Sequence, residues 1–336
     1  MRRRGTLGLV LCGVGAALIA LAPLLHWWVG PSLIKSPIGG DTVSDAAADN
    51  ATYLDFQDLQ QKSGTVRSRD VYHGVEADST KSVAVYTLDS EIYAGSEPNL
   101  PTDISAGQER FAIDRDSGLA VPDPKGKEQV DKDINNDKAK HSGLILKFPI
   151  GTEKKSYPFW DAHIRSSEHA MEYRGEETIA GLKTYRFEQS IPDTVLPEQE
   201  PEAHYISHRT VWVDPATGVI VKGEQQVNIT AGSASDTNRT TVLDGTFTFT
   251  PENIADSAKR AKDGKSTITL LRVTLPVLLL IIGLLVLAAG LLLTLRRPAA
   301  PADTEAGPEA GPEPPVRRRR GLRRSEDTAD QPAGSR

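Results

Sequence analysis

The chain has 336 residues, with 45 acidic against 39 Lys and Arg residues and a formal net charge of −6. Two long apolar runs enclose its middle part, which keeps 38 acidic against 27 basic residues. This acidic excess argues against nucleic acid as a partner. The single cysteine, Cys12, lies in the first apolar run, so the middle part can form neither a disulfide nor a thiolate metal site.

The first apolar run, residues 6–29, predicts a transmembrane helix after a cytoplasmic N-terminus of residues 1–5. About 20 helical residues cross a hydrocarbon core of ~30 Å. A cleaved signal peptide is the alternative, because three arginines precede the run and Ala20-Leu21-Ala22 offers a small-residue site. However, the run is long for a signal peptide, and Pro23 follows that site. We therefore predict an uncleaved anchor.

The second apolar run, residues 275–295, contains no charged side chain and predicts a second span. Basic residues flank both runs on their outer sides, at residues 2–4 and at Arg296 and Arg297. The positive-inside rule then places both chain ends in the cytoplasm and the middle part outside it. Residues 296–336 are rich in Pro, Ala, Gly and charge, which predicts a disordered cytoplasmic tail.

Residues 251–274 are predicted to form a juxtamembrane helix and a connector. Thr250 and Pro251 have the residue types that favour the N-cap and the first helical position. Gly264 follows several basic residues, as expected at a helix C-terminus. We therefore expect a short polar helix that ends near Asp263 and leads into the second span.

The middle part repeats a pattern at an offset of about 100 residues, in the sense of an internal duplication. In both copies a Tyr-x-Gly, a second tyrosine, an aspartate and a glycine recur in the same order. The matched residues are Tyr72, Gly74, Tyr86, Asp114 and Gly118 in the first copy, and Tyr173, Gly175, Tyr185, Asp214 and Gly218 in the second. β-rich runs flank each Asp-to-Gly turn, which predicts a hairpin in each copy.

These patterns predict two transmembrane α-helices that flank a mainly antiparallel β (α+β) extracytoplasmic domain, with duplicated curved sheets. The predicted boundaries are a β unit at 30–124, a linker at 125–145, a second β unit at 146–250, and the membrane and tail segments given above. The second unit is similar to the half-barrel sheets of bacterial lipoprotein carriers, which wrap an apolar cavity. The matching residues are Gly181, Tyr185, Phe187, residues 211–214, Thr217, Gly218 and Lys222.

The whole chain resembles the actinobacterial two-span membrane protein family labelled PorA-type porin, formerly a domain of unknown function. The segment Tyr157-Pro158-Phe159-Trp160-Asp161 is the most specific part of the resemblance, which covers roughly residues 5–295. The resemblance implies a pore in an outer mycolate layer. It offers no catalytic residue to carry over. Against a pore, neither span contains the charged residue that usually marks an ion path.

Motifs that carry chemistry are weak in this sequence. His204 and His208 have metal-ligand spacing only on a helix, and the prolines before them oppose a helix. Asp161, His163 and His169 offer an acid and a base without an evident nucleophile. We therefore predict no catalytic residue, no metal and no cofactor, and a hydrolase is the least favoured function.

One surface remains as a candidate binding site. Tyr157, Phe159, Trp160 and Asp161 form either a platform for a ligand or partner, or an aromatic plug that closes a sheet. The preferred function is a non-catalytic envelope module, held in the cell membrane by both ends, that binds an envelope lipid, a glycan or a protein. An oligomeric pore is the alternative. The sequence does not indicate the oligomeric state.

Overall fold

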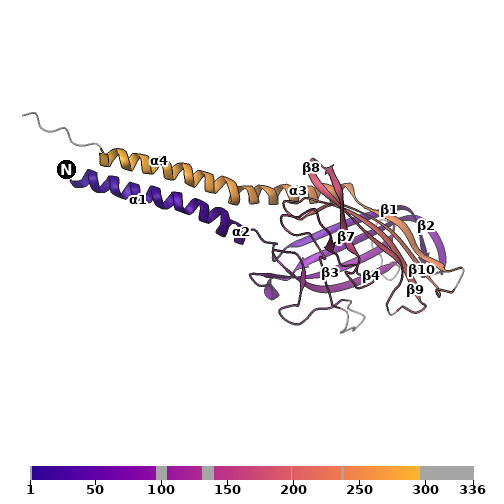
Figure 1. The fold of residues 1–336 in the computed structure, drawn as a ribbon. Coiled ribbons are helices and arrows are strands. Elements are labelled where there is room, and N and C mark those ends of the chain that lie inside the picture. Colours follow the sequence, from indigo (N-terminus) through magenta and orange to yellow (C-terminus); the bar gives the residue numbers. More distant parts are fainter. Residues whose placement is uncertain (1, 96–103, 131–139, 198, 236–237, 296–336) are drawn as a thin grey trace, which may run out of the picture. The chain divides into compact units, whose positions relative to one another are not determined.

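The computed structural model describes residues 2–95, 104–130, 140–197, 199–235 and 238–295. The predicted tail at 296–336 and the middle of the predicted linker therefore lie outside the described residues. Helices occupy both ends of the described chain, and an antiparallel sheet lies between them in the sequence (Figure 1). This confirms the predicted fold class.

All named strands join one sheet of 11 strands in the order β5-β4-β3-β2-β1-β11-β10-β9-β8-β7-β6. The strands of both sequence repeats thus belong to one continuous sheet, because β1 pairs with β2 on one side and with β11 on the other. The bounds are β1 Asp41–Asp55, β2 Gln60–Gly74, β3 Val83–Ala94, β4 Ser105–Asp114, β5 Ala120–Val121, β6 Tyr157–Pro158, β7 Ala170–Ile179, β8 Leu182–Val195, β9 Ala203–Val213, β10 Ile220–Ala231 and β11 Thr240–Phe249.

The two repeated hairpin turns have matching geometry. In each, the glycine N–H donates to the aspartate carbonyl, from Gly118 to Asp114 at 2.9 Å and from Gly218 to Asp214 at 2.8 Å. Each aspartate carboxylate also accepts a hydroxyl bond at 2.8 Å from the residue before the glycine. Both glycines have φ near +75°, at +74° and +75°, a region that glycine enters without the steric cost other residues meet.

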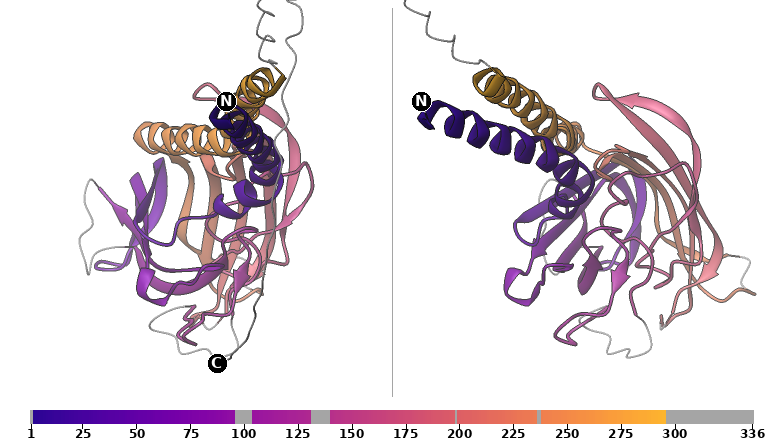
Figure 2. Two further views of the ribbon diagram at one scale, coloured as in Figure 1. Left: turned by 90° about the vertical axis from the view of Figure 1, so that its left-hand side faces the viewer. Right: turned by 60° about the vertical axis from the view of Figure 1, so that its left-hand side comes forward.

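The two outermost strands of the sheet are linked to each other through Gly143 and Leu144. The Ala120 N–H in β5 donates to the Gly143 carbonyl at 2.7 Å, and the Leu144 N–H donates to the Pro158 carbonyl of β6 at 2.8 Å. The Trp160 N–H then donates to the Leu144 carbonyl at 2.7 Å. These bonds close the curved sheet upon itself at this point. Figure 2 shows the curvature of its strands.

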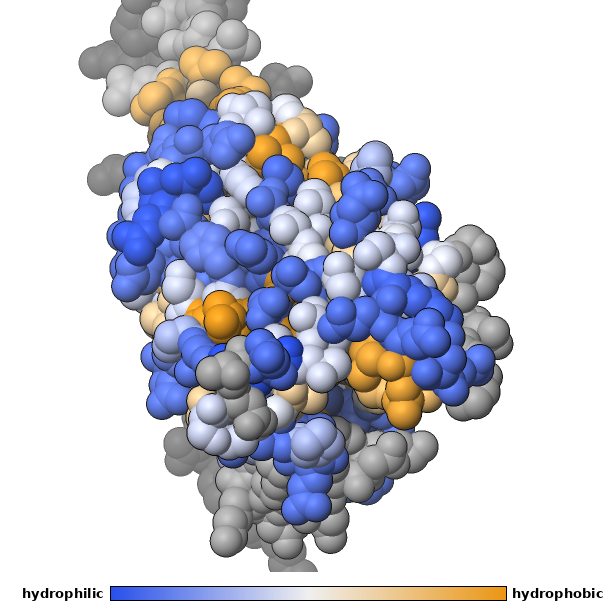
Figure 3. Space-filling model, turned by 90° about the vertical axis from the view of Figure 1, so that its right-hand side faces the viewer, coloured by the Kyte–Doolittle hydropathy of each residue, from blue (hydrophilic) through white to orange (hydrophobic). Residues whose placement is uncertain are grey.

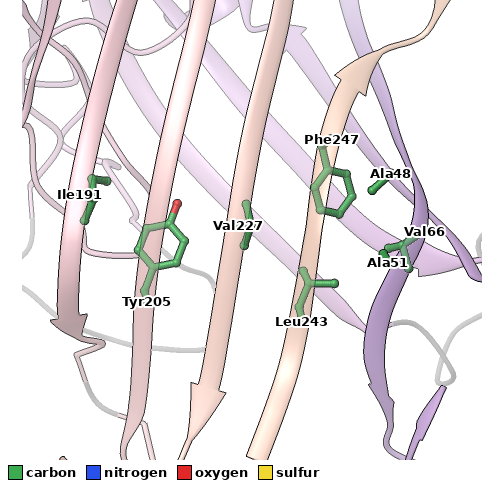
Figure 4. Close-up of a cluster of buried hydrophobic side chains, with 8 residues drawn as sticks. All are labelled: Ala48, Ala51, Val66, Ile191, Tyr205, Val227, Leu243 and Phe247. Carbon is green, nitrogen blue, oxygen red and sulfur yellow. The ribbon is translucent and has the colours of Figure 1, made fainter. Parts of the chain in front are cut away.

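Three clusters of buried side chains surround the inside of the curved sheet. The first, drawn in Figure 4, takes side chains from β1, β2 and β8 to β11. The second gathers around Phe111 and Trp160, and the third around Phe148 and Phe187. Along each strand, alternate side chains face this interior, as the pleat requires. The outer face instead carries ion pairs such as Arg69–Asp45 and Arg174–Glu172.

The two apolar helices pack against each other through glycines. These are α1 (Arg2–Leu24) and α4 (Leu275–Leu295), each with the length and hydropathy of a membrane span. A Cβ on Gly15 would lie 2.8 Å from the Gly283 carbonyl oxygen, and one on Gly290 would lie 2.8 Å from the Gly8 carbonyl oxygen. The pairing is therefore antiparallel, and small residues permit the close approach typical of membrane helix pairs.

Helix α3 (Pro251–Thr269) starts as predicted, but it does not end at Gly264. The Thr250 hydroxyl oxygen accepts a bond from the Asn253 N–H at 3.2 Å, which caps the helix. The prediction of a helix end near Asp263 was wrong. Gly264 allows close packing instead, because a Cβ there would lie 3.0 Å from the Thr217 methyl group in the second hairpin turn.

From α3 the chain continues through a π-helical turn, Leu270–Thr274, into α4. Pro276 has no N–H to donate to the carbonyl of Arg272, four residues earlier. That carbonyl instead accepts a bond from the Nδ1 of His26, within the π-helical turn Leu25–Val29 that leads to α2 (Gly30–Leu33). A side chain of one helix thus supplies the hydrogen bond that a backbone carbonyl of the other helix lacks. Such pairing is required where the surroundings of a span are apolar.

We predict that Gly143→Ala destabilises the protein much more than Gly126→Ala. The two glycines have similar φ angles of +68° and +64°, and each substitution should lower the free energy of unfolding by about 1 kcal/mol through backbone strain. Only at Gly143 would the new Cβ also meet backbone, 2.7 Å from the Pro158 carbonyl oxygen. Thermal unfolding of the full chain in detergent measures both effects. Equal midpoints for the two variants would contradict the closure assigned to Gly143.

Candidate functional site

The curved sheet encloses a cavity of about 770 Å³. Its walls are the inner faces of β1 to β4 and of β9 to β11, one face of α3, and the loops around residues 145–165. This volume lies within the range of about 300–1,000 Å³ that small-molecule and cofactor sites occupy. The cavity is therefore the candidate binding site among the described residues.

Small side chains on the inner face of β1, together with Ser68 on β2, leave space for the cavity. Ser44, Ala46 and Ala48 succeed one another on the inner side of β1, and Ser68 faces the same space from β2. Protein interiors otherwise pack as densely as organic crystals. On the neighbouring strands β3 and β11, larger apolar side chains such as Leu88 and Phe247 line the wall. The resulting space suits a ligand with a large apolar part.

A hydrogen-bonded group of polar side chains lies at one wall of the cavity. The buried carboxylate of Asp161 accepts bonds from the Tyr205 hydroxyl at 3.1 Å and from Arg209 Nη2 at 3.0 Å. The Gln225 side-chain amide donates to the Tyr205 oxygen at 2.9 Å and to the Ser207 hydroxyl oxygen at 3.0 Å. Burial is the main reason why the pKa of Tyr205 is raised. These bonds hold the loop after β6 against β9.

Asp70 places a carboxyl group on the cavity wall at the middle of β2. Burial raises its pKa to about 6, although a hydrogen bond from Ser90 and the charge of Arg209 act in the opposite direction. Burial likewise raises the pKa of the neighbouring Tyr72 hydroxyl. Asp70 is therefore a group that can hold a proton inside the cavity at mildly acidic pH.

The four predicted site residues lie in the interior of the protein. Tyr157 stacks edge-on against Phe148 and Phe187 in the third core cluster. Phe159 and Trp160 are also buried, and both line the cavity. Asp161 is the acceptor described above. The segment therefore forms a wall of the cavity, and not an exposed platform.

The histidines do not assemble a metal site among the residues that the structure describes. His204 and His208 lie on a strand, where His204 contacts Asp193 and Glu202 and His208 contacts Ser190. His163 stacks on the Tyr205 ring, and its Nδ1 lies 3.8 Å from the Asp161 carboxylate. Burial lowers the pKa of His163.

Sequence reasoning missed the polar residues that line the cavity, among them Asp70, Lys147, Arg209, Asn253 and Arg260. The alternation Val66-x-Ser68-x-Asp70-x-Tyr72 was visible as one face of a strand. However, nothing in the sequence says which face of a strand points inward when both faces carry polar residues. The register with β1 and β3 decides it.

The site and the fold define a membrane protein with two candidate spans and a cavity-bearing β domain between them. The family model described as Porin PorA matches residues 7–292, so the chain belongs to this family. The resemblance stated from the sequence is thereby confirmed.

Two curated relatives carry the name Porin PorA. The one from Corynebacterium amycolatum is 25% identical and aligns with 66% of this chain and 77% of its own. The one from Corynebacterium resistens is 23% identical, with 60% and 70% covered. Among solved structures, an outer membrane lipoprotein-sorting protein domain from Vibrio parahaemolyticus aligns with 67% of this chain and 88% of its own, at 10% identity and a TM-score of 0.19.

We predict that Asp70→Asn raises the thermal unfolding midpoint at pH 7.5 and raises it less, or not at all, at pH 4. The folded-state pKa of about 6 exceeds the value of about 3.9 for an unfolded chain. In the unchanged protein, the contribution of Asp70 to the free energy of unfolding is therefore most favourable below about pH 4. It is lost as the pH rises through about 6 and the buried carboxyl group ionises. The asparagine does not titrate and avoids this loss.

Thermal unfolding midpoints of the full chain at the two pH values measure the effect. Asp244→Asn, at an exposed carboxylate on β11, is the matched control and should show no such gain. A difference between Asp70→Asn and the unchanged protein that does not grow with pH would contradict the burial of Asp70 as a carboxyl group.

Proposed function

We propose that this protein is a non-catalytic module of the cell envelope that binds an amphipathic lipid in the cavity of its sheet. The cavity is the observation that carries this proposal. Its volume of about 770 Å³ accommodates a ligand with acyl chains, and most binding sites of this size combine apolar walls with a few polar groups. The apolar side chains on the strands beside β1 and β2 supply the apolar walls, and the group around Asp161 supplies the polar groups.

The proposed topology has both chain ends in the cytoplasm and the β domain outside it. The charge pattern supports this, since arginines flank both spans on the side away from the domain. Two spans that pack through glycines would hold the domain close to the membrane. A domain held in this way has access to lipid without leaving the membrane surface.

An oligomeric pore is the second candidate function, and the name of the family and its curated relatives favours it. The ion pairs on the outer face of the sheet are unsuited to contact with lipid. A pore would therefore be built by the spans of several copies. The exposed side chains of α4 are long and apolar, such as Leu285 and Leu292, which suits contact with acyl chains more than an aqueous path.

The lipid-binding proposal predicts that lipid is retained when the full chain is extracted from its membrane in mild detergent. Native mass spectrometry should detect bound lipid in the unchanged protein. Ser44→Phe with Ser68→Phe places two rings in the cavity and should reduce occupancy by about tenfold or more, because the space is filled. Ser63→Phe, at an exposed position on the same strand, is the control and should retain the lipid. Loss of lipid in the control as well, or no loss of lipid in the double variant, would contradict the site.

The pore candidate is tested by conductance across planar bilayers of the purified full chain. The lipid-binding proposal predicts no discrete current steps above those of protein-free bilayers. A pore built from several copies predicts steps whose frequency rises more steeply than the protein concentration. Such steps, in a preparation free of other membrane proteins, would establish the pore.

A further inference from the structure

The cavity extends to the place where both membrane helices join the β domain. Leu33 and Ile34, which follow the first span, line it, and so do Thr267 and Ile268, which precede the second. The π-helical turns at the ends of the two spans also contact each other. One end of the cavity therefore lies at the level where the chain enters the membrane.

Exposed apolar side chains surround this end. Leu33 is 61% exposed, and Leu270 and Val273, in the π-helical turn before α4, are 47% and 51% exposed. Trp27 and Trp28 are exposed on the first span at the same level, as expected at a membrane interface. By contrast, the face of the β domain in Figure 3 is largely hydrophilic, with separate hydrophobic patches. The apolar rim thus gives the cavity an opening toward acyl chains.

The lining of the cavity is less acidic than the domain around it. The segment between the spans is acidic, yet the described lining has an excess of basic residues. Its basic residues are Lys35, Lys147, Arg165, Arg209 and Arg260, and its acidic residues are Asp70, Glu109 and Glu224. Within this set, Arg209 is paired with Asp161 and Lys35 with Asp116. Beyond these two pairs, the basic and acidic residues of the lining are equal in number, so affinity for an anionic ligand depends on individual cations and not on net charge.

Two of these cations lie near the membrane end of the cavity and have hydroxyl partners. Lys147 Nζ donates to the Ser36 hydroxyl oxygen at 2.9 Å, and Ser36 lies two residues after Ile34. Arg260 Nη2 donates to the Ser257 hydroxyl oxygen at 2.7 Å. Arg260 lies two helical turns before Thr267, on the same face of α3. Neither has a carboxylate within salt-bridge distance among the described residues. Burial lowers the pKa of Lys147 to about 8 and also lowers the pKa of Arg260, so an anion would stabilise both charged forms.

We propose that the cavity accepts an anionic lipid directly from the membrane leaflet, with its acyl chains between the sheet and α3 and its phosphate headgroup bound by Lys147 and Arg260. This inference rests on the proposed lipid-binding function and adds the class of lipid and its orientation. The acyl chains enter past the apolar rim, and the headgroup stays at the opening near the interface.

The test places the full chain in nanodiscs of equal parts phosphatidylglycerol and phosphatidylcholine and measures the bound lipid by native mass spectrometry. The unchanged protein should retain phosphatidylglycerol over phosphatidylcholine by about tenfold or more, since charge-assisted bonds of this kind discriminate at that level. Lys147→Met with Arg260→Met should lose the preference and still bind lipid. Lys147→Arg with Arg260→Lys keeps both charges and should restore the preference.

Lys155→Met with Lys259→Met is the matched control, because it removes the same charge at two exposed positions, and it should keep the preference. If the unchanged protein retains both lipids equally, or the Lys147 and Arg260 variant keeps the preference, the headgroup assignment is wrong and the lipid-binding function stands. If the unchanged protein retains no lipid, both proposals are wrong. Unfolding midpoints confirm that each variant is folded before it is compared.

Discussion

Gly143 and Leu144 lie between the two outermost strands of the sheet and form a backbone hydrogen bond with each. An open antiparallel sheet of this size would leave two edges with unpaired backbone groups, which proteins usually protect. Here the two edges are joined through one short segment, and the curvature of the sheet follows from that closure. The buried Leu144 side chain and the neighbouring Phe148 and Phe159 fill the space beneath the closure. The interior of the sheet is thereby separated from its outer face.

Closure creates an interior that the side chains do not fill completely. Three hydrophobic clusters lie around the cavity, and a fourth packs Ala258 and Ala261 of α3 against the sheet. Together they provide burial that stabilises the fold. The small residues of β1 and β2 forgo part of that burial, and the polar groups at the wall are held by one another, as in the pairing of Asp161 with Arg209. A cavity maintained against the tendency of cores to pack densely is more consistent with ligand binding than with a purely structural role.

The second membrane helix is continuous with the β domain, because α3 leads into it without a loop. Helix α3 packs on the sheet, lines the cavity and leads through a π-helical turn into α4. The glycines of α1 and α4 fix the two spans against each other. The same elements therefore position the domain at the membrane and form the end of the cavity that faces it, so that anchoring and the proposed access of lipid depend on one junction.

The sequence by itself determined the two spans, the hairpin turns and the β character of the domain, because length, apolar composition and turn residues are local properties. It also predicted the N-cap at Thr250, and the family resemblance depended on motifs along the chain. It identified the aromatic segment at Tyr157 to Trp160 without deciding between a platform and a wall. Only the tertiary structure decided that, and it also decided that Gly264 packs against Thr217 where the sequence indicated a helix end. The cavity, its extension to the residues next to both spans and the place of Lys147 and Arg260 in its lining depend on strand register and on the closure at Gly143. These are contacts between residues far apart in the chain, and no local pattern specifies them.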